Sequence, residues 1–261
     1  MFVIGERING MFTDVKKAIQ AQDPAPIQQL ARDQVAAGAN ALDINVGPAS
    51  ADKLGAMQWL VDAAKQAVDV PLCIDTTNAE VMKAGLEAAQ GNAIINSTTG
   101  EEERMEKVLP LAAEYDCPLI GLTIDAEGVP RDANGRMEIA LRLVSACMAQ
   151  GISTTDLYID AVILPVNALQ QVPQEVLDTL QMCKALSDPP PQTVLGLSNI
   201  SQGALHRELI NRIYLVMALA NGLDAAIMDP LDTELMDAAI TSEVLLNRNV
   251  YCDDFLKAYR K

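Results

Sequence analysis

A short apolar run that ends in polar residues, followed by a helical pattern, recurs along the chain. The runs are continuous rather than alternating, which is typical of strands covered on both faces. Apolar residues in the segments between them recur every three or four positions, which is the helix period. The runs predict strands at 2–9, 41–47, 70–78, 92–100, 118–126, 157–165, 193–201 and 224–230. The segments between and after them predict helices at 26–38, 57–67, 79–89, 102–115, 138–151, 174–187, 210–222 and 234–247.

Eight strand–helix units in 261 residues are typical of a (β/α)8 TIM barrel. Several predicted helices end near a glycine, such as Gly38, Gly151 and Gly222, as helix C-termini often do. A doubly wound open sheet is the alternative, but it usually has a glycine-rich turn after its first strand. The stretch GERING at 5–10 does not match that turn. We therefore predict one barrel domain over residues 1–261.

Polar side chains gather where the predicted strands end, and a barrel brings those ends together at the face that carries active sites. They are Glu6, Asn9, Asp43, Asn45, Asp75, Asn96, Asp125, Asp160, Asn199 and Asp229. Any one of them is also an ordinary strand-end or N-cap residue. A carboxylate or an amide at nearly every strand end, with almost no cation, indicates a binding site.

The mixture of acids and amides restricts the class of ligand that this site can bind. A magnesium or calcium site gathers carboxylates, whereas here amides lie between them. An amide offers both a donor and an acceptor, which suits a planar heterocycle with both kinds of group along its edge. A pterin is such a heterocycle, because its amino group and N3–H donate and its O4, N1 and N5 accept.

Composition excludes several other classes of function. The chain has 19 Lys and Arg against 35 Asp and Glu, a net charge of −16, which disfavours nucleic acids and anionic membranes. The N-terminus does not resemble a secretory signal, and the apolar stretch 213–228 is interrupted by Asn221 and Asp224. The five scattered cysteines form no CxxC pair and His206 is the one histidine, so we expect no zinc site. Free thiols are expected in a reducing cytoplasm.

Six motifs carry a family resemblance. They are GERIN at 5–9, LDINVG at 42–47, CIDTTN at 73–78, INS at 95–97, YIDAVILP at 158–165 and LGLSNIS at 195–201. In these motifs the chain resembles the methyltetrahydrofolate:corrinoid methyltransferases, and most narrowly those that serve the corrinoid iron-sulfur protein of acetyl-CoA synthesis. It is also similar to the folate domain of cobalamin-dependent methionine synthase. The resemblance runs from residue 1 to about residue 256.

Dihydropteroate synthase, which has the same barrel, is less similar. It carries a TPDSFSDG-like loop after its first strand, and this chain has NGMFTD there, at 9–14.

The resemblance implies a set of substrate-binding residues, which are Glu6, Asp75, Asn96, Asp160, Asn199, Gln202 and Arg207. Asp75, Asn96 and Asp160 would hydrogen-bond the pterin edge. Asn199 would lie near N5, with Gln202 close by on the same loop. Glu6 would order the network, and Arg207 would meet the anionic glutamate tail unless it is a solvated charge on a helix.

The reaction that the resemblance implies moves the methyl group from N5 of 5-methyltetrahydrofolate to Co(I) of a corrinoid. Co(I) is a strong nucleophile, so the protein has to supply none. N5 must gain a proton before it can leave. Asn199 is the expected catalytic residue, because its side-chain oxygen can accept a hydrogen bond from N5–H⁺ and stabilise the charge.

No cobalamin-binding motif is present, because DxHxxG needs a histidine and His206 lies in ALHREL. We therefore expect the corrinoid to arrive on a partner, the corrinoid iron-sulfur protein, and the chain itself to bind no metal. The resemblance further implies a homodimer. Two alternatives stay open: the methyltetrahydrofolate arm of a glycine betaine or methylamine demethylation system, and a folate-binding protein without turnover.

Overall fold

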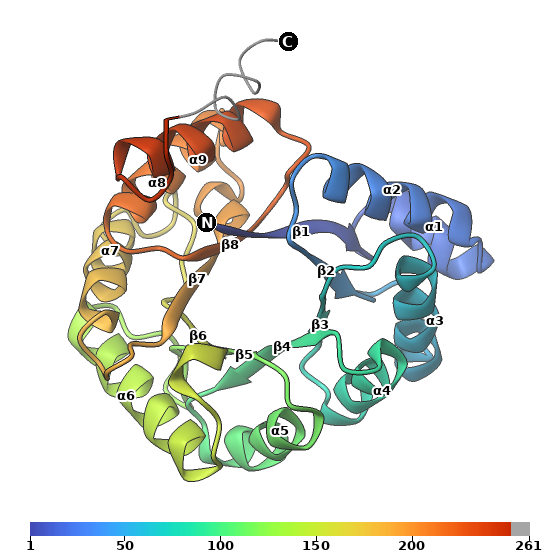
Figure 1. Ribbon diagram of the computed structural model, residues 1–261, viewed down its shortest axis with the longest axis horizontal. Helices are drawn as coiled ribbons and strands as arrows, with labels where there is room; N and C mark the ends of the chain where they lie inside the picture. The colour runs from blue at the N-terminus through green and yellow to red at the C-terminus, as the bar shows by residue number, and fades with distance from the viewer. Residues whose placement is uncertain (252–261) are drawn as a thin grey trace.

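The structure, a computed structural model, describes residues 1–251, and its strands close into a parallel barrel in chain order. Figure 1 shows this ring of strands surrounded by the helices. The strands are β1 Phe2–Asn9, β2 Ala41–Asn45, β3 Leu72–Asp75, β4 Ala93–Thr99, β5 Leu119–Leu122, β6 Leu157–Asp160, β7 Gln192–Gly196 and β8 Ala225–Met228. The predicted TIM barrel is confirmed. The prediction of one domain over residues 1–261 extends into residues 252–261, which lie outside the described part of the chain.

Helices cover the outside of the barrel between successive strands (Figure 1). They are α1 Thr13–Ala21, α2 Pro24–Ala36, α3 Lys53–Lys65, α4 Ala79–Ala89, α5 Glu102–Tyr115, α6 Ala133–Ala149, α7 Val172–Cys183, α8 Arg207–Ala220 and α9 Thr233–Leu245. Two 3₁₀ turns, η1 Thr154–Asp156 and η2 Leu197–Ser201, precede β6 and follow β7. Among residues 1–251 no helix is long and apolar enough to cross a bilayer.

Two features differ from the sequence prediction. Helix α1 was not predicted, although its buried residues Val15, Ala18 and Ile19 follow the helix spacing. Most strands end earlier than predicted, and the difference is largest for three of them, which end at Leu122 instead of 126, at Asp160 instead of 165 and at Gly196 instead of 201. The apolar residues that continue these runs pack in loops at the top of the barrel, so hydrophobicity alone places the strand ends too late.

The barrel interior changes from apolar to polar along its axis. Successive side chains of a strand point to opposite faces, so every second residue points into the barrel. The middle of the interior is filled by a buried cluster that includes Ile4, Cys73, Ile94 and Val194. Two residues further along each strand, at the C-terminal ends, the inward positions become mostly polar. The apolar cluster therefore forms the floor under a polar chamber.

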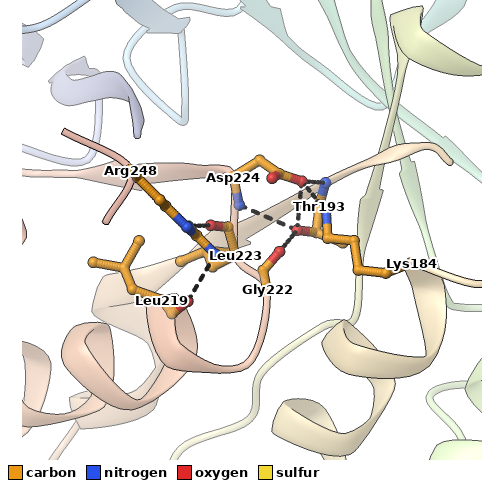
Figure 2. Close-up of polar contacts among 7 residues, drawn as sticks. All are labelled: Lys184, Thr193, Leu219, Gly222, Leu223, Asp224 and Arg248. Atoms are coloured by element: carbon orange, nitrogen blue, oxygen red, sulfur yellow. Dashed lines mark hydrogen bonds and ion pairs between the residues drawn. The ribbon is translucent and has the colours of Figure 1, made fainter. Parts of the chain in front are cut away.

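At the opposite, N-terminal end of the barrel, polar side chains tie α7, α8, β7 and β8 together (Figure 2). The Asp224 carboxylate accepts hydrogen bonds from the Thr193 amide, at 2.8 Å, and hydroxyl, at 3.0 Å, and pairs with Lys184. Arg248 donates to the carbonyls of Leu219 and Leu223 at the C-terminus of α8, at 3.0 and 2.9 Å. Contacts at this face of a TIM barrel serve stability rather than catalysis.

Replacing Arg248 with Ala is expected to lower the free energy of unfolding by about 1–3 kcal/mol, because two carbonyls at a helix end lose a charged donor. Urea unfolding of both proteins measures the change. Arg32→Ala is the matched control, since Arg32 is exposed and donates only to Gln29. Equal midpoints for the two variants would contradict a stabilising role for Arg248.

Candidate active site

A cavity of about 740 Å³ opens at the C-terminal ends of the strands. Its size falls within the range of small-molecule sites. Its lining includes Glu6, Arg7, Asn9, Phe12, Asp43, Asp75, Thr77, Asn96, Ser97, Leu122, Asp160, Gly196, Ser198, Asn199, Arg207, Glu208, Asn211, Ile227, Asp229, Leu231, Asp232 and Leu235. Most of the polar ring that the sequence predicted thus lines one cavity, but Asn45 and Asp125 do not.

The structure brings six of the seven expected substrate contacts to this cavity, which are Glu6, Asp75, Asn96, Asp160, Asn199 and Arg207. Gln202 follows the turn but is exposed and does not line the cavity. Asp125, expected in the polar ring, lies beyond the end of β5 and pairs with Arg142, 3.5 Å away. The roles given to the six residues stay predictions.

Asp43 and Asp75 form a buried carboxyl pair on β2 and β3. Asn96 donates to Asp43 at 3.0 Å, and Asn45 donates to Asp75 at 2.5 Å. Burial raises the pKa of Asp43 well above its ordinary value, and the negative charge of Asp75 raises it further. Burial also raises the pKa of Asp75, but hydrogen bonds from Asn45 and Asp43 oppose the rise. Of the two carboxyls, Asp43 therefore has the more strongly raised pKa and is the one that more readily keeps a proton.

Asp160 ends β6 as a buried carboxylate. Its Oδ1 accepts a hydrogen bond from the Val162 amide at 2.7 Å. Burial raises the pKa of Asp160 to about 6, although hydrogen bonds from the Val162 and Gly196 amides oppose the rise. Near neutral pH Asp160 is an ionised acceptor with unused lone pairs on the cavity side.

The η2 turn after β7 carries Asn199 and is fixed at both ends. Ser198 Oγ donates to Glu6 at 2.7 Å, and Arg207 donates to Ser201 Oγ at 3.1 Å and to the Ser198 carbonyl at 3.2 Å. Burial raises the pKa of Glu6, and the bond from Ser198 opposes the rise. Glu6 and Arg207 thus hold the loop on which Asn199 lies.

Asn199 itself is exposed at the rim of the cavity and folds back over Gly196. A Cβ atom at position 196 would lie 2.9 Å from the Asn199 Nδ2 atom. Glycine at 196 therefore leaves the space that the Asn199 amide occupies.

Sequence reasoning missed two contributors. Arg7 lines the cavity and its guanidinium lies 4.1 Å from the centre of the Phe12 ring, so Arg207 is not the only cation at the site. Ser198 orients Glu6. The signal for Arg7 was its place next to Glu6 in GERIN, but a residue next to an inward-facing one on a strand is expected to point outward.

In residues 1–251 no group of three or more His, Cys, Asp or Glu side chains is arranged to hold a metal ion. The expectation that this chain binds no metal stays a prediction. Cys73, Cys117, Cys147 and Cys183 are buried free thiols, and Cys252 lies outside the described residues.

Known proteins resemble this chain over most of its length. The pterin binding enzyme family matches residues 6–229. A methylcorrinoid:tetrahydrofolate methyltransferase of Eubacterium limosum is 31% identical over 265 residues, which cover 100% of this chain and 97% of that protein. Methionine synthase of Mycobacterium tuberculosis is 32% identical over 240 residues, 87% of this chain and 20% of that protein. The chain therefore spans about one fifth of that relative.

The fold has solved neighbours as well. Dihydropteroate synthase of Yersinia pestis, in complex with a sulfonamide drug, superposes with a TM-score of 0.70 at 17% identity and covers 95% of this chain and 94% of its own. At that identity the likeness shows the fold alone. The resemblance to corrinoid-linked methyltransferases and to methionine synthase is confirmed by the closer relatives. The match over residues 6–229 shows that the chain belongs to the pterin binding enzyme family.

Proposed function

We propose that this protein is a methyltransferase that moves a methyl group between N5 of tetrahydrofolate and the cobalt of a corrinoid carried by a partner protein. The observation that carries the proposal is the polar chamber, in which Asp75, Asn96 and Asp160 come from three strands of the barrel, β3, β4 and β6, and line one cavity. Similarity over the full chain to a protein named for the same two substrates supports it.

The chamber suits a pterin because its groups differ in protonation. Ionised Asp160 is proposed to accept two hydrogen bonds, from the pterin amino group and from N3–H. Charge-assisted bonds of this kind are stronger than neutral ones. Asn96 offers a donor and an acceptor to the rest of the edge, and the Asp43–Asp75 pair holds a proton below it. Arg7 and Arg207 at the cavity wall suit the anionic glutamate tail.

The reaction needs little from the protein beyond binding and charge stabilisation. Co(I) supplies the electron pair of the new Co–C bond, and the electrons of the N5–C bond pass to N5. Protonated N5 then leaves as a neutral amine. Asn199 is proposed to accept a hydrogen bond from N5–H⁺ at the rim, where a corrinoid can approach, and so to stabilise the charge in the transition state. The buried carboxyl pair is proposed to belong to the path that supplies the proton.

Two partners are compatible with this chemistry. The corrinoid iron-sulfur protein of acetyl-CoA synthesis, a pathway of carbon fixation, is the partner that we propose. The second candidate is the corrinoid protein of a glycine betaine or methylamine demethylation system. It is favoured by the name of the Eubacterium limosum relative, methylcorrinoid:tetrahydrofolate methyltransferase, because that name gives the methylcorrinoid as the methyl donor. In that system the net flow is from the corrinoid to tetrahydrofolate. A cytoplasmic location fits either partner and is part of the proposal.

Isotope exchange tests the function. With the methyl group labelled, the protein should catalyse transfer from 5-methyltetrahydrofolate to cob(I)alamin and, in reverse, from methylcobalamin to tetrahydrofolate. Binding of one folate per chain without exchange in either direction would support the alternative of a folate-binding protein without turnover. Comparing the two corrinoid proteins as substrates then identifies the partner.

A homodimer is also part of the proposal. Leu209, Ile213 and Met217 lie on one face of α8 and are about half exposed, beside an apolar groove of about 450 Å³ against α7. Such a face is unusual for a monomer surface and suits a second copy of the chain. Sedimentation equilibrium measures the association. A monomer at every concentration would remove this part of the proposal and leave the methyl transfer untouched.

A further inference from the structure

One buried cation near the site is not used by the proposed chemistry. Arg136 lies near the start of α6 and has no exposed surface. Its Nε donates to the Ala161 carbonyl at 2.9 Å, while Nη1 and Nη2 have no hydrogen-bond partner among the described residues. Burying a charge is costly unless the charge is paired or hydrogen-bonded. Glu175 and Asp132 provide the nearby negative charges. Because burying this guanidinium is costly, its presence at this position requires a structural or functional explanation.

The peptide group that Arg136 contacts is unusual. It joins Ala161 to Val162, and Val162 has a φ of +55°. Such a left-handed conformation is a strained outlier for a β-branched residue. The other non-glycine residues of the described chain with positive φ are Gln22, Gln90, Asp116, His206 and Asn247, which lie at helix ends and are not β-branched. Val162 therefore needs an external restraint.

Both ends of this peptide group are hydrogen-bonded. Its carbonyl accepts from Arg136, and its N–H, which belongs to Val162, donates to Asp160 Oδ1 at 2.7 Å. The carbonyl of Asp160 is fixed separately by the amide and hydroxyl of Thr123, at 2.9 and 3.1 Å. A peptide group is planar, so a donor that fixes its carbonyl also fixes the direction of its N–H. A cationic donor on the carbonyl also polarises the N–H.

We propose that Arg136 is a positioning residue, which holds the Ala161–Val162 peptide in its left-handed conformation so that the Val162 N–H orients the Asp160 carboxylate. Without that hydrogen bond the strained segment relaxes and the carboxylate loses a donor. The consequence for folate binding rests on the proposed function. The consequence for Asp160 itself does not.

The titration of Asp160 in the protein without ligand reports on this bond. The Val162 amide lowers the pKa of Asp160, which burial raises to about 6, so losing the bond moves the pKa upward. The other ionisable groups that line the cavity are Glu6, Arg7, Asp43, Asp75, Arg207, Glu208, Asp229 and Asp232. Cys73 and Tyr158 lie in the layer below. Substitutions at Arg136 leave all of these groups in place.

Arg136→Gln and Arg136→Met form a matched pair. Glutamine places its Nε2 where the arginine Nε lies, so the donor to Ala161 is kept and the charge is lost. Methionine has the same length and places a methyl group there. Carboxyl ¹³C NMR follows Asp160, with Asp160→Asn assigning the signal. The expected midpoint is close to wild type for Arg136→Gln and about one pH unit higher for Arg136→Met.

Two further variants complete the test. Val162→Gly added to Arg136→Met should return the midpoint toward wild type, because glycine adopts a positive φ without strain. If Arg136→Met does not fold, Arg136→Lys replaces it, because lysine puts a methylene where Nε lies and keeps the charge. It should also raise the midpoint.

Equal midpoints in all variants, or equal shifts for glutamine and methionine, would overturn the proposal. If the shifts occur but wild-type protein binds no folate, the proposed function fails while the positioning role stands. If folate binds, its affinity near pH 6.5 should weaken about threefold in Arg136→Met, because a rise of about one pH unit in the midpoint lowers the ionised fraction of Asp160 by that factor, and it should change little in Arg136→Gln.

Discussion

Asn199→Ala should lower kcat for methyl transfer by about 100- to 1000-fold while folate affinity changes little. This is the scale measured when one charge-stabilising group is removed from an active site. The reason is that the Asn199 oxygen is proposed to accept a hydrogen bond from N5–H⁺, a charge that neutral bound folate lacks and that forms on the way to the transition state. A contact that acts only there changes kcat, whereas a uniform binding contact changes KM.

Gly196 offers a second probe of the same group. The backbone at Gly196 has a φ of −72°, which alanine adopts, but its Cβ would lie 2.9 Å from Asn199 Nδ2. Gly196→Ala should therefore displace the Asn199 amide without removing it. The kcat of Gly196→Ala should lie between the values for the wild type and for Asn199→Ala.

Single-turnover transfer to cob(I)alamin gives the rate without product release, and equilibrium titration gives the affinity. Circular dichroism checks folding, which should survive because Asn199 is exposed on a turn. Asn199→Asp adds a carboxylate that attracts the N5 proton, and it should move the pH profile of the rate. If Asn199→Ala transfers methyl at the parent rate but binds folate weakly, the residue holds the substrate and does not act in catalysis.

Asp160→Ala should weaken folate binding by about 2–4 kcal/mol, because the pterin amino group and N3–H lose a charged acceptor. Affinity in the wild type should also fall as the pH drops through about 6, since the protonated carboxyl no longer accepts both bonds. In the variant this pH dependence should disappear. Calorimetric titration across the pH range measures both effects. Unchanged affinity in a folded variant would make Asp160 structural.

Removing the charge of Asp160 should increase the stability of the folded protein, although it weakens folate binding. The pKa of Asp160 is raised from 3.8 to about 6 in the folded protein, so folding is penalised at a pH above both values and the penalty disappears as the pH falls toward 3.8. The isosteric Asp160→Asn should therefore increase the free energy of unfolding at pH 7 by up to about 3 kcal/mol, and by little near pH 4. Loss of affinity together with gain of stability marks a residue kept for function. Urea unfolding at both pH values checks it.

The barrel and the place of its site follow from the sequence because the underlying signals are local. Each predicted strand is an apolar run that ends in polar residues, and the parallel strand order fixes which face these residues share. Asp75, Asn96 and Asp160 could be placed in one cavity on that basis alone. The family resemblance supplied the reaction, which spacing and composition do not reveal.

The features that the sequence did not predict depend on tertiary contacts. The run at 157–165 continues apolar past Asp160, yet the chain leaves the sheet because Val162 turns back to the carboxylate and Arg136 holds its peptide group. The sequence did not show that Gln202 lies outside the cavity lining or that Arg7 lies in it. Nor did it show that the pKa of Asp43 is raised, which depends on burial beside Asp75.

Single-turnover methyl transfer tests the central claim most directly. Protein in excess over 5-methyltetrahydrofolate is mixed with cob(I)alamin, and the visible spectrum of the corrinoid is followed in time. Formation of methylcobalamin should be many times faster than without protein and should saturate with protein concentration. A rate equal to that without protein, in a sample that binds folate in the same titration, would contradict the proposal that this pterin site performs methyl transfer.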